Sequence, residues 1–230
     1  MYGKELTAVK KTIIITSYIE HPFPVDGLIT PDDLVICTDG GYDIAKKNNI
    51  IPDVLLGDFD SISDDYDSIA RNLSHKIDII KFNPEKDFTD LDLAIKEAIA
   101  RNSSHVEIWG GIGGRLDHTV ANLQILTNYG KDFESLQIMD GRNRCFVLYG
   151  SDGPDRVIPK QEDSYLSLFS MSECCRGLTV SGVKYSLHNH TMFRTFPLGV
   201  SNEITSDEAV ISLKEGTLLV VISRKESAML

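Results

Sequence analysis

The stretch DVLLGDFDSI, residues 53–62, places a short apolar run directly before two closely spaced acids. The run stops at Gly57, and Asp58 and Asp60 follow with one residue between them. Other short, β-branched apolar runs are typical of strands that are covered on both faces. They lie at 11–16, 34–38, 76–82, 105–109 and 135–139.

Helical patterns alternate with these runs, and strands that alternate with helices predict a mainly parallel sheet with helices on its faces. From residue 143 the pattern changes to strands divided by Gly, Pro, Ser and Asp, which predicts a smaller all-β sandwich. We therefore expect an α/β domain over 1–142 and a β-sandwich domain over 143–230. The helical patterns lie at 42–49, 63–73, 90–102 and 116–129.

Composition and charge limit the possible functions. The 230 residues carry a formal net charge of −11, which repels a phosphate backbone and argues against nucleic acid as a partner. The four cysteines show no CxxC spacing, so neither a disulfide framework nor a structural zinc site is favoured. No apolar run approaches the roughly 18 residues of a membrane span, and the first residues lack a signal-peptide pattern. These features predict a soluble, cytoplasmic protein.

Several predicted strands end on residues that carry chemistry. Asp39 and the Asp58/Asp60 pair follow two strands, EKDFTD (85–90) follows a third, and GGIGGRLD (110–117) follows a fourth. In open α/β sheets, ligands bind beyond these carboxyl ends. Crowded carboxylates repel one another unless a cation joins them, and Mg²⁺ prefers oxygen ligands. A glycine turn that opens a helix presents N–H groups to an anion. The pattern indicates metal-assisted phosphoryl-type transfer.

Each of these features also has a purely structural interpretation. An Asp-x-Asp pattern after a strand is often only a polar turn. Thr89 has the T-x-x-D spacing of a helix cap, which would leave Asp90 as a first-turn acid. His118 is either a general base or a structural residue at a helix start. We interpret HNH at 188–190 as a polar loop, because no third metal ligand accompanies it.

Four segments together resemble the thiamine pyrophosphokinase family: TDGGYDIAKKNNIIPDVLLGDFDSI, EKDFTDLDLAI, GGIGGRLDHTVANL and GVSNEI. Their order and spacing match over nearly the whole chain. The resemblance implies an α/β catalytic domain followed by a β-sandwich, and a homodimer whose active sites are shared between subunits. It also implies transfer of the pyrophosphoryl unit of ATP to the hydroxyl of thiamine, with Mg²⁺, to give thiamine diphosphate and AMP.

The resemblance further implies roles for individual residues. Asp58, Asp60 and Asp90 are similar to the magnesium-binding acids of the family, and Lys86 and Arg115 to its phosphate contacts. These five form the candidate catalytic set, in which Asp90 or Asp60 is the candidate acceptor of the hydroxyl proton. The other implied ligand-binding positions are Asp39, Ser61, Thr89, Gly113, Gly114, Asp117, His118, Ser201 and Asn202, of which the last two match a Ser-Asn pair that lines the thiamine pocket.

Two departures from the family pattern concern the thiamine end. The last strand, TLLVVIS, lacks the aromatic on which some members stack thiamine, and Tyr42 and Asp43 stand where Ala-Asn is frequent. Two alternatives stay open. One is the same chemistry on another alcohol, such as a hydroxymethyl-pterin, and the other is a non-catalytic thiamine- or nucleotide-binding protein. The complete set of acids and cations favours an enzyme, and the second domain with SNEI favours thiamine.

Overall fold

The computed structural model describes residues 11–22, 25, 27–59, 77–83, 88–151 and 155–226. The chain divides into two compact units, one of residues 1–125 with 132–141 and the other of residues 126–131 with 142–230. Whether these are domains that meet at residue 143 stays a prediction. Among the helices in the described part of the chain, none has the length and apolar character to cross a membrane.

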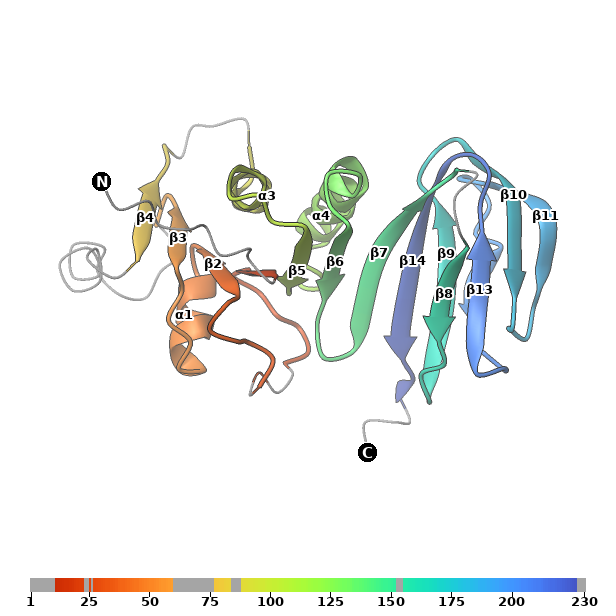
Figure 1. Ribbon diagram of the computed structural model, residues 1–230, viewed down its shortest axis with the longest axis horizontal. Coiled ribbons are helices and arrows are strands. Elements are labelled where there is room, and N and C mark those ends of the chain that lie inside the picture. Colours follow the sequence, from red (N-terminus) through yellow and green to blue (C-terminus); the bar gives the residue numbers. More distant parts are fainter. Residues whose placement is uncertain are drawn as a thin grey trace. The chain divides into compact units, whose positions relative to one another are not determined.

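The first unit is built on a parallel sheet (Figure 1). In space its strands follow the order β6-β5-β1-β2-β3-β4. Every residue of β1, β2 and β3 is buried. This agrees with the sequence, in which continuous apolar runs predict strands that are covered on both faces. The strands are β1 Thr12–Ile15, β2 Leu34–Thr38, β3 Val54–Gly57, β4 Asp78–Lys81, β5 His105–Trp109 and β6 Ser135–Met139.

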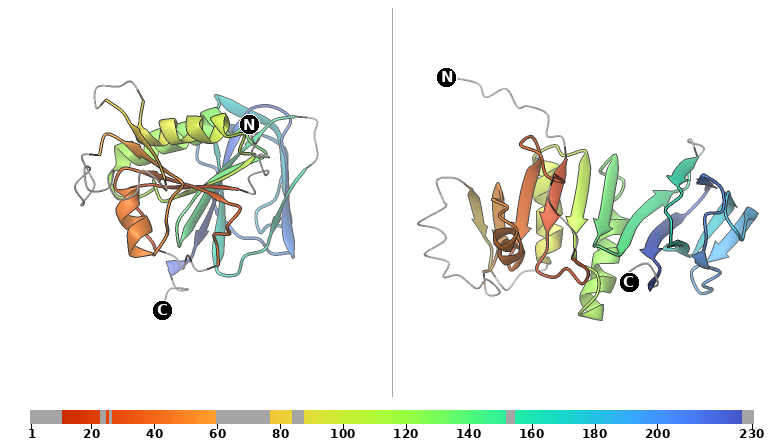
Figure 2. Two further views of the ribbon diagram at one scale, coloured as in Figure 1. Left: turned by 60° about the vertical axis from the view of Figure 1, so that its left-hand side comes forward. Right: turned by 90° about the horizontal axis from the view of Figure 1, so that it is seen from below.

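Helices cover both faces of this sheet. Helix α1, Gly41–Lys47, and helix α3, Asp90–Ala100, pack against β1 and β2 from opposite faces (Figure 2). A Cβ added at Gly41 would lie 2.1 Å from the Ile15 carbonyl oxygen, so α1 approaches β1 this closely only because residue 41 is glycine. Helix α4 spans Leu116–Tyr129, and its last turn belongs to the second unit. The predicted helix at 63–73 lies outside the described residues.

The second unit consists of two antiparallel sheets, with strand orders β12-β9-β14-β7 and β11-β10-β13-β8. Leu168 and Val220 of the first sheet share one apolar core with Leu178 and Ile211 of the second. The predicted α/β fold with a smaller all-β sandwich is therefore confirmed. The strands are β7 Asn143–Tyr149, β8 Arg156–Pro159, β9 Ser164–Ser170, β10 Cys174–Ser181, β11 Leu187–Phe193, β12 Gly199–Asn202, β13 Glu208–Ser212 and β14 Thr217–Arg224.

The interpretation of residues 188–190 as a loop is wrong, because all three lie in β11. The strand is irregular there: Asn189 has a φ of 45°, and the pairing with β10 shifts register nearby. The Asn189 N–H donates to Thr179 Oγ1 at 3.0 Å, so the two strands stay joined across the irregularity. The segment is polar, but its pairing with β10 makes it a strand. The sequence of the segment alone does not indicate this pairing.

Candidate active site

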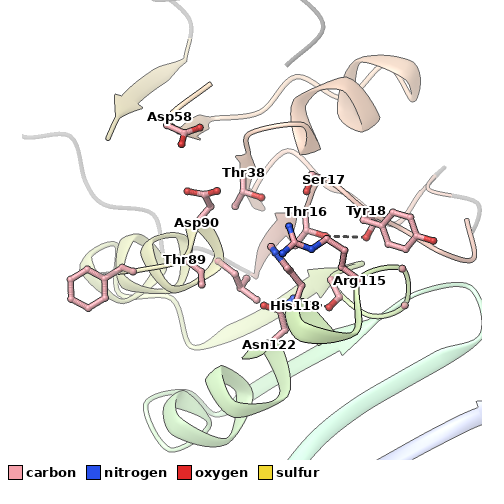
Figure 3. Close-up of a pocket in the computed structure, with 15 residues that line it drawn as sticks. Thr16, Ser17, Tyr18, Thr38, Asp58, Thr89, Asp90, Arg115, His118 and Asn122 are labelled. Atoms are coloured by element: carbon pink, nitrogen blue, oxygen red, sulfur yellow. Dashed lines mark hydrogen bonds between the residues drawn. The ribbon is translucent and has the colours of Figure 1, made fainter. Parts of the chain in front are cut away.

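Three aspartates meet beyond the carboxyl ends of β2 and β3. Asp39 directly follows β2, Asp58 directly follows β3, and Asp90 is the first residue of α3. Because β2 and β3 are parallel neighbours, both deliver their acids to the same edge of the sheet. Figure 3 shows the side chains of Asp58 and Asp90 pointing toward one another, with Thr38 beside them.

Asp39 is almost fully buried, with 6% of its surface exposed. The pKa of Asp39 is raised to about 7, mainly by burial and also by the negative charges of Asp90 and Asp58. A hydrogen bond from the Phe59 N–H to Asp39 Oδ1, at 3.0 Å, opposes this shift. Burial and the two neighbouring acids thus favour the neutral form of Asp39, whereas a hard cation bound nearby would favour the charged form.

The metal site itself is not complete within the described part of the chain. There, no group of three or more His, Cys, Asp or Glu side chains is arranged to hold a metal ion. Asp60, Ser61 and Lys86 all lie outside the described residues. The magnesium ligands, the Ser61 contact and the Lys86 phosphate contact therefore stay predictions.

The glycine-rich turn between β5 and α4 is tightly folded, with positive φ angles at four of its glycines. The Gly113 N–H donates to Thr119 Oγ1 at 3.1 Å, and the Gly114 N–H donates to Glu20 Oε2 at 2.8 Å. The sequence predicts that these N–H groups face a bound anion, and in the structure each of them has an acceptor within the protein. Phosphate contacts of Gly113 and Gly114 stay predictions.

Arg115 follows the turn and forms a two-pronged ion pair with Asp117. Its Nε lies 3.2 Å from Asp117 Oδ1 and its Nη2 lies 2.6 Å from Asp117 Oδ2. The hydrogen bonds from Arg115 lower the pKa of the Asp117 carboxyl. The guanidinium has five N–H groups, and Asp117 takes two of them. Asp117 thus fixes the direction of a cation whose side chain is 72% exposed.

Thr89 and His118 occupy positions where both a structural and a ligand-binding role are open. Thr89 Oγ1 accepts a hydrogen bond from the Asp92 N–H at 3.2 Å, so its interpretation as the cap of α3 is confirmed. His118 lies in the first turn of α4 with its side chain toward the cavity described below (Figure 3). Ligand contacts of both residues stay predictions.

Asp58, Asp90, Arg115 and His118 line one cavity of about 660 Å³ in the first unit. Asp58 and Asp90 lie toward one end, and Arg115 and His118 lie farther along it (Figure 3). A cavity of this volume accommodates a small-molecule ligand. The other residues that line it are Thr16, Ser17, Tyr18, Thr38, Phe88, Thr89, Leu91, Gly111, Gly113, Gly114 and Asn122.

Sequence reasoning missed Ser17, Tyr18 and Asn122. Ser17 and Tyr18 follow β1, so the rule that identified Asp39 and Asp58 from their strand ends applies to them equally. Asn122 lies four residues after His118 on the same face of α4. Its Nδ2 donates to the Gly111 carbonyl oxygen at 2.7 Å, which ties the helix to the glycine turn.

The predicted thiamine residues, Ser201 and Asn202, lie in β12 of the second unit. Asn202 Oδ1 accepts from the Tyr185 N–H at 3.0 Å, and Asn202 Nδ2 donates to the Tyr185 carbonyl oxygen at 2.9 Å. Ser201 has a φ of 56°, and its N–H donates to Ser167 Oγ at 3.0 Å. The Asn202 amide therefore braces the backbone at Tyr185, and thiamine contacts of Ser201 and Asn202 stay predictions.

Two family models match the chain one after the other. The model described as thiamin pyrophosphokinase, catalytic domain, matches residues 25–139. The model described as thiamin pyrophosphokinase, vitamin B1 binding domain, matches residues 156–218. A thiamine pyrophosphokinase of Bacillus subtilis (strain 168) is 30% identical over 190 residues, which cover 83% of this chain and 87% of that protein.

Solved structures agree with the sequence matches. The crystal structure of thiamine pyrophosphokinase from Bacillus subtilis has a TM-score of 0.80 at 28% identity, and the match covers 94% of this chain and 100% of that one. The thiamin pyrophosphokinase of Geobacillus thermodenitrificans has a TM-score of 0.82 at 25% identity, with 94% and 98% covered. Since both family models match in order and the fold agrees over nearly the whole length, this chain belongs to the thiamin pyrophosphokinase family.

Proposed function

We propose that the protein is a thiamine diphosphokinase, which transfers the pyrophosphoryl group of ATP to the hydroxyl of thiamine and releases AMP. One observation carries this proposal: Asp58, Asp90 and Arg115 line a single cavity in the part that matches the catalytic-domain model. Carboxylates at one end and a guanidinium farther along suit a polyphosphate that arrives with a cation. The vitamin B1 binding match over 156–218 favours thiamine over a pterin alcohol as the acceptor.

We also propose that Asp58, Asp60 and Asp90 hold Mg²⁺. Their oxygen donors suit this cation. The negative charges of Asp58 and Asp90 contribute, after burial, to the raised pKa of Asp39, so these two acids lie close to Asp39. When bound, the cation neutralises charge on the phosphates and makes AMP a better leaving group. Asp58 and Asp90 then set where the polyphosphate lies, and Asp90 or Asp60 is the candidate acceptor of the thiamine hydroxyl proton.

The role proposed for Arg115 is to bind the phosphates. A guanidinium presents paired N–H groups that match phosphate oxygens, and Asp117 already holds that group in one orientation. Less side-chain freedom is then lost when ATP binds. Both side chains of the ion pair are largely exposed to solvent, so the pair contributes little to the stability of the fold. Its role is to orient the Arg115 guanidinium.

Replacement of Arg115 tests this role. Arg115→Lys keeps the charge but loses the planar fork, and we expect it to raise the KM for ATP several-fold. Arg115→Ala should raise that KM by roughly tenfold or more, because a charge-assisted contact is lost. The KM for thiamine should change little in both variants. Steady-state kinetics measure these values, with Arg176→Ala as a control, since Arg176 is exposed and does not line the cavity. Unchanged ATP kinetics in Arg115→Ala would assign the turn a structural role only.

We further propose that the protein forms a homodimer in which each active site combines the α/β unit of one subunit with the sandwich of its partner. Symmetric dimers are the commonest oligomers of soluble proteins. The second unit supports this proposal with a run of large apolar side chains that are 45–63% exposed, at the end of β11, in the segment that follows it and in β12. Exposed apolar surface of this kind marks contact sites. The residues are Phe193, Phe196, Leu198 and Val200.

We also propose a cytoplasmic location. Cys37, Cys145, Cys174 and Cys175 are all free thiols, and Cys37, Cys145 and Cys175 are buried. A reducing compartment keeps such thiols in this state.

A product analysis tests the proposed function. The protein is incubated with ATP, Mg²⁺ and thiamine, and nucleotides and thiamine esters are then separated. We expect AMP and thiamine diphosphate in equal amounts. A parallel incubation replaces thiamine with a hydroxymethyl-pterin, and turnover of the pterin in place of thiamine would establish the alternative acceptor. Formation of ADP alone, or no turnover with either alcohol, would contradict the proposal.

A further inference from the structure

The backbone of Tyr18 is fixed beside the cavity by two hydrogen bonds. Its carbonyl oxygen accepts from the Gly111 N–H at 2.9 Å and from Thr16 Oγ1 at 3.2 Å (Figure 3). A Cβ added at Gly110 would lie 2.2 Å from this carbonyl oxygen. The close approach of the glycine turn to the segment after β1 therefore requires glycine at residue 110. Tyr18 therefore has a defined position before any ligand binds.

The side chain of Tyr18 is also held in place, by one hydrogen bond and by its contact with the glycine turn. Its hydroxyl donates to Glu20 Oε2 at 3.1 Å, and the same oxygen accepts from the Gly114 N–H at 2.8 Å. A Cβ added at Gly114 would lie 2.8 Å from Tyr18 Cε1, so the edge of the ring rests directly on the turn. The Gly114 N–H and the Tyr18 hydroxyl both lower the pKa of Glu20, so these hydrogen bonds favour its charged form.

Tyr18 stays partly exposed despite these contacts. Tyr18 lines the cavity and is 45% exposed, although it is a large residue in a region of close packing. The hydroxyl contact and the turn restrict both side-chain torsions, so little freedom is lost when a planar ligand stacks on the ring. Stacking of a base on an aromatic side chain typically strengthens binding by about fivefold to a hundredfold.

We propose that Tyr18 is the platform on which the adenine ring of ATP stacks, and that Glu20 is the positioning residue that holds it. This inference rests on the proposed function. In Figure 3, Tyr18 lies at the far end of the cavity from Asp58, with Arg115 between them. ATP carries its triphosphate and its base at opposite ends. A triphosphate placed over the acids and Arg115 directs the base toward Tyr18.

Thiamine also contains aromatic rings, and two observations favour adenine at this position. Tyr18 belongs to the first unit, whereas the vitamin B1 binding match covers residues 156–218 of the second. Glu20 joins Tyr18 to Gly114, and Gly114 stands directly before Arg115, the residue proposed to bind the phosphates of ATP. Tyr18 and Arg115 are thus placed to bind two parts of one nucleotide.

Substitution of Tyr18 gives the direct test. Tyr18→Leu should raise the KM for ATP by about tenfold, while kcat and the KM for thiamine change less than about twofold. Tyr18→Phe keeps the ring and loses only the bond to Glu20, so its KM for ATP should rise no more than about threefold. Thermal unfolding of both variants confirms that they are folded before the comparison is made.

A ligand without a base separates stacking from phosphate binding. Binding of ATP and of inorganic tripolyphosphate, both with Mg²⁺, is measured by calorimetry on the wild-type protein and on Tyr18→Leu. We expect ATP binding to weaken by about tenfold and tripolyphosphate binding to stay unchanged. An equal loss for both ligands, or a rise in the thiamine KM in place of the ATP KM, overturns the proposal.

Glu20 is tested against an exposed glutamate of the same unit. Glu20→Ala should raise the KM for ATP several-fold at nearly constant kcat. Glu20→Gln keeps an acceptor oxygen and should restore most of the affinity for ATP. Glu134→Ala is the matched control, because Glu134 is 74% exposed and does not line the cavity. Equal effects of Glu20→Ala and Glu134→Ala would overturn the positioning role.

The results separate this proposal from the proposed function. If the wild-type protein forms AMP and thiamine diphosphate while Tyr18→Leu keeps the wild-type KM for ATP, the stacking platform is wrong and the function stands. If the wild-type protein forms neither product, the proposed function is wrong. The calorimetric comparison of ATP with tripolyphosphate then still decides whether Tyr18 binds a base.

Discussion

Asp58→Asn is expected to lower turnover by about a hundredfold or more while the protein stays folded. The substitution keeps the size of the side chain and removes one negative charge from the group that includes Asp39 and Asp90. If that group holds the cation that carries the triphosphate, loss of a charged ligand weakens stabilisation of the transition state directly. Turnover is measured with ATP, Mg²⁺ and thiamine at saturating concentrations, and folding is followed by thermal unfolding.

Asp132→Asn is the control for this experiment. Asp132 is an exposed aspartate of the same unit that does not line the cavity, so the same change of charge there should leave turnover unaltered. Asp90→Asn should behave like Asp58→Asn. Turnover near the wild-type value in a folded Asp58→Asn protein would refute the metal-binding role of Asp58.

The second expected result is that two inactive variants regain activity when their subunits form mixed dimers. Asp58→Ala removes the catalytic half of a site. Asn202→Ala removes the brace on the Tyr185 backbone in the sandwich, and with it the proposed thiamine half. In a mixed dimer with shared sites, one site collects both defects and the other collects none. After free exchange of equal amounts, half of the dimers are mixed, so activity should recover to roughly a quarter of the wild-type value.

This recovery distinguishes shared sites from sites within one subunit. If each site were built from a single chain, every site in the mixture would keep one defect. Exchange is confirmed by tagging one variant and detecting the other in the tagged dimers. With exchange confirmed, activity no higher than the average of the two separate variants would exclude the shared site. A monomer in solution would exclude the homodimer itself.

The fold could be predicted from the sequence because its signals are local. The runs that became β1, β2 and β3 are apolar at almost every position, and buried parallel strands require that composition. Thr89 was identifiable as a cap because the residues of a capping contact lie within one turn of each other. The strand β11 was not identifiable, because its pairing with β10 is a contact between distant segments.

The site was predictable in part for the same reason. Asp39, Asp58 and Asp90 stand next to strand ends or a helix start, and a single topological rule brings such positions together. The bond between Glu20 and Gly114 joins residues 94 positions apart, and no periodicity or motif indicates it. The contacts of the Asn202 amide with the backbone at Tyr185 likewise join segments that no motif connects. A motif identifies a position, but only the fold shows which partner its side chain takes.

The central claim is that the β- and γ-phosphates of ATP move to thiamine as one unit, and ATP radiolabelled at the β-phosphate tests it most directly. The protein is incubated with labelled ATP, Mg²⁺ and thiamine, and the products are separated. Transfer of the pyrophosphoryl unit predicts labelled thiamine diphosphate and unlabelled AMP. Labelled ADP with unlabelled thiamine monophosphate would show transfer of the γ-phosphate alone, and it would contradict the account.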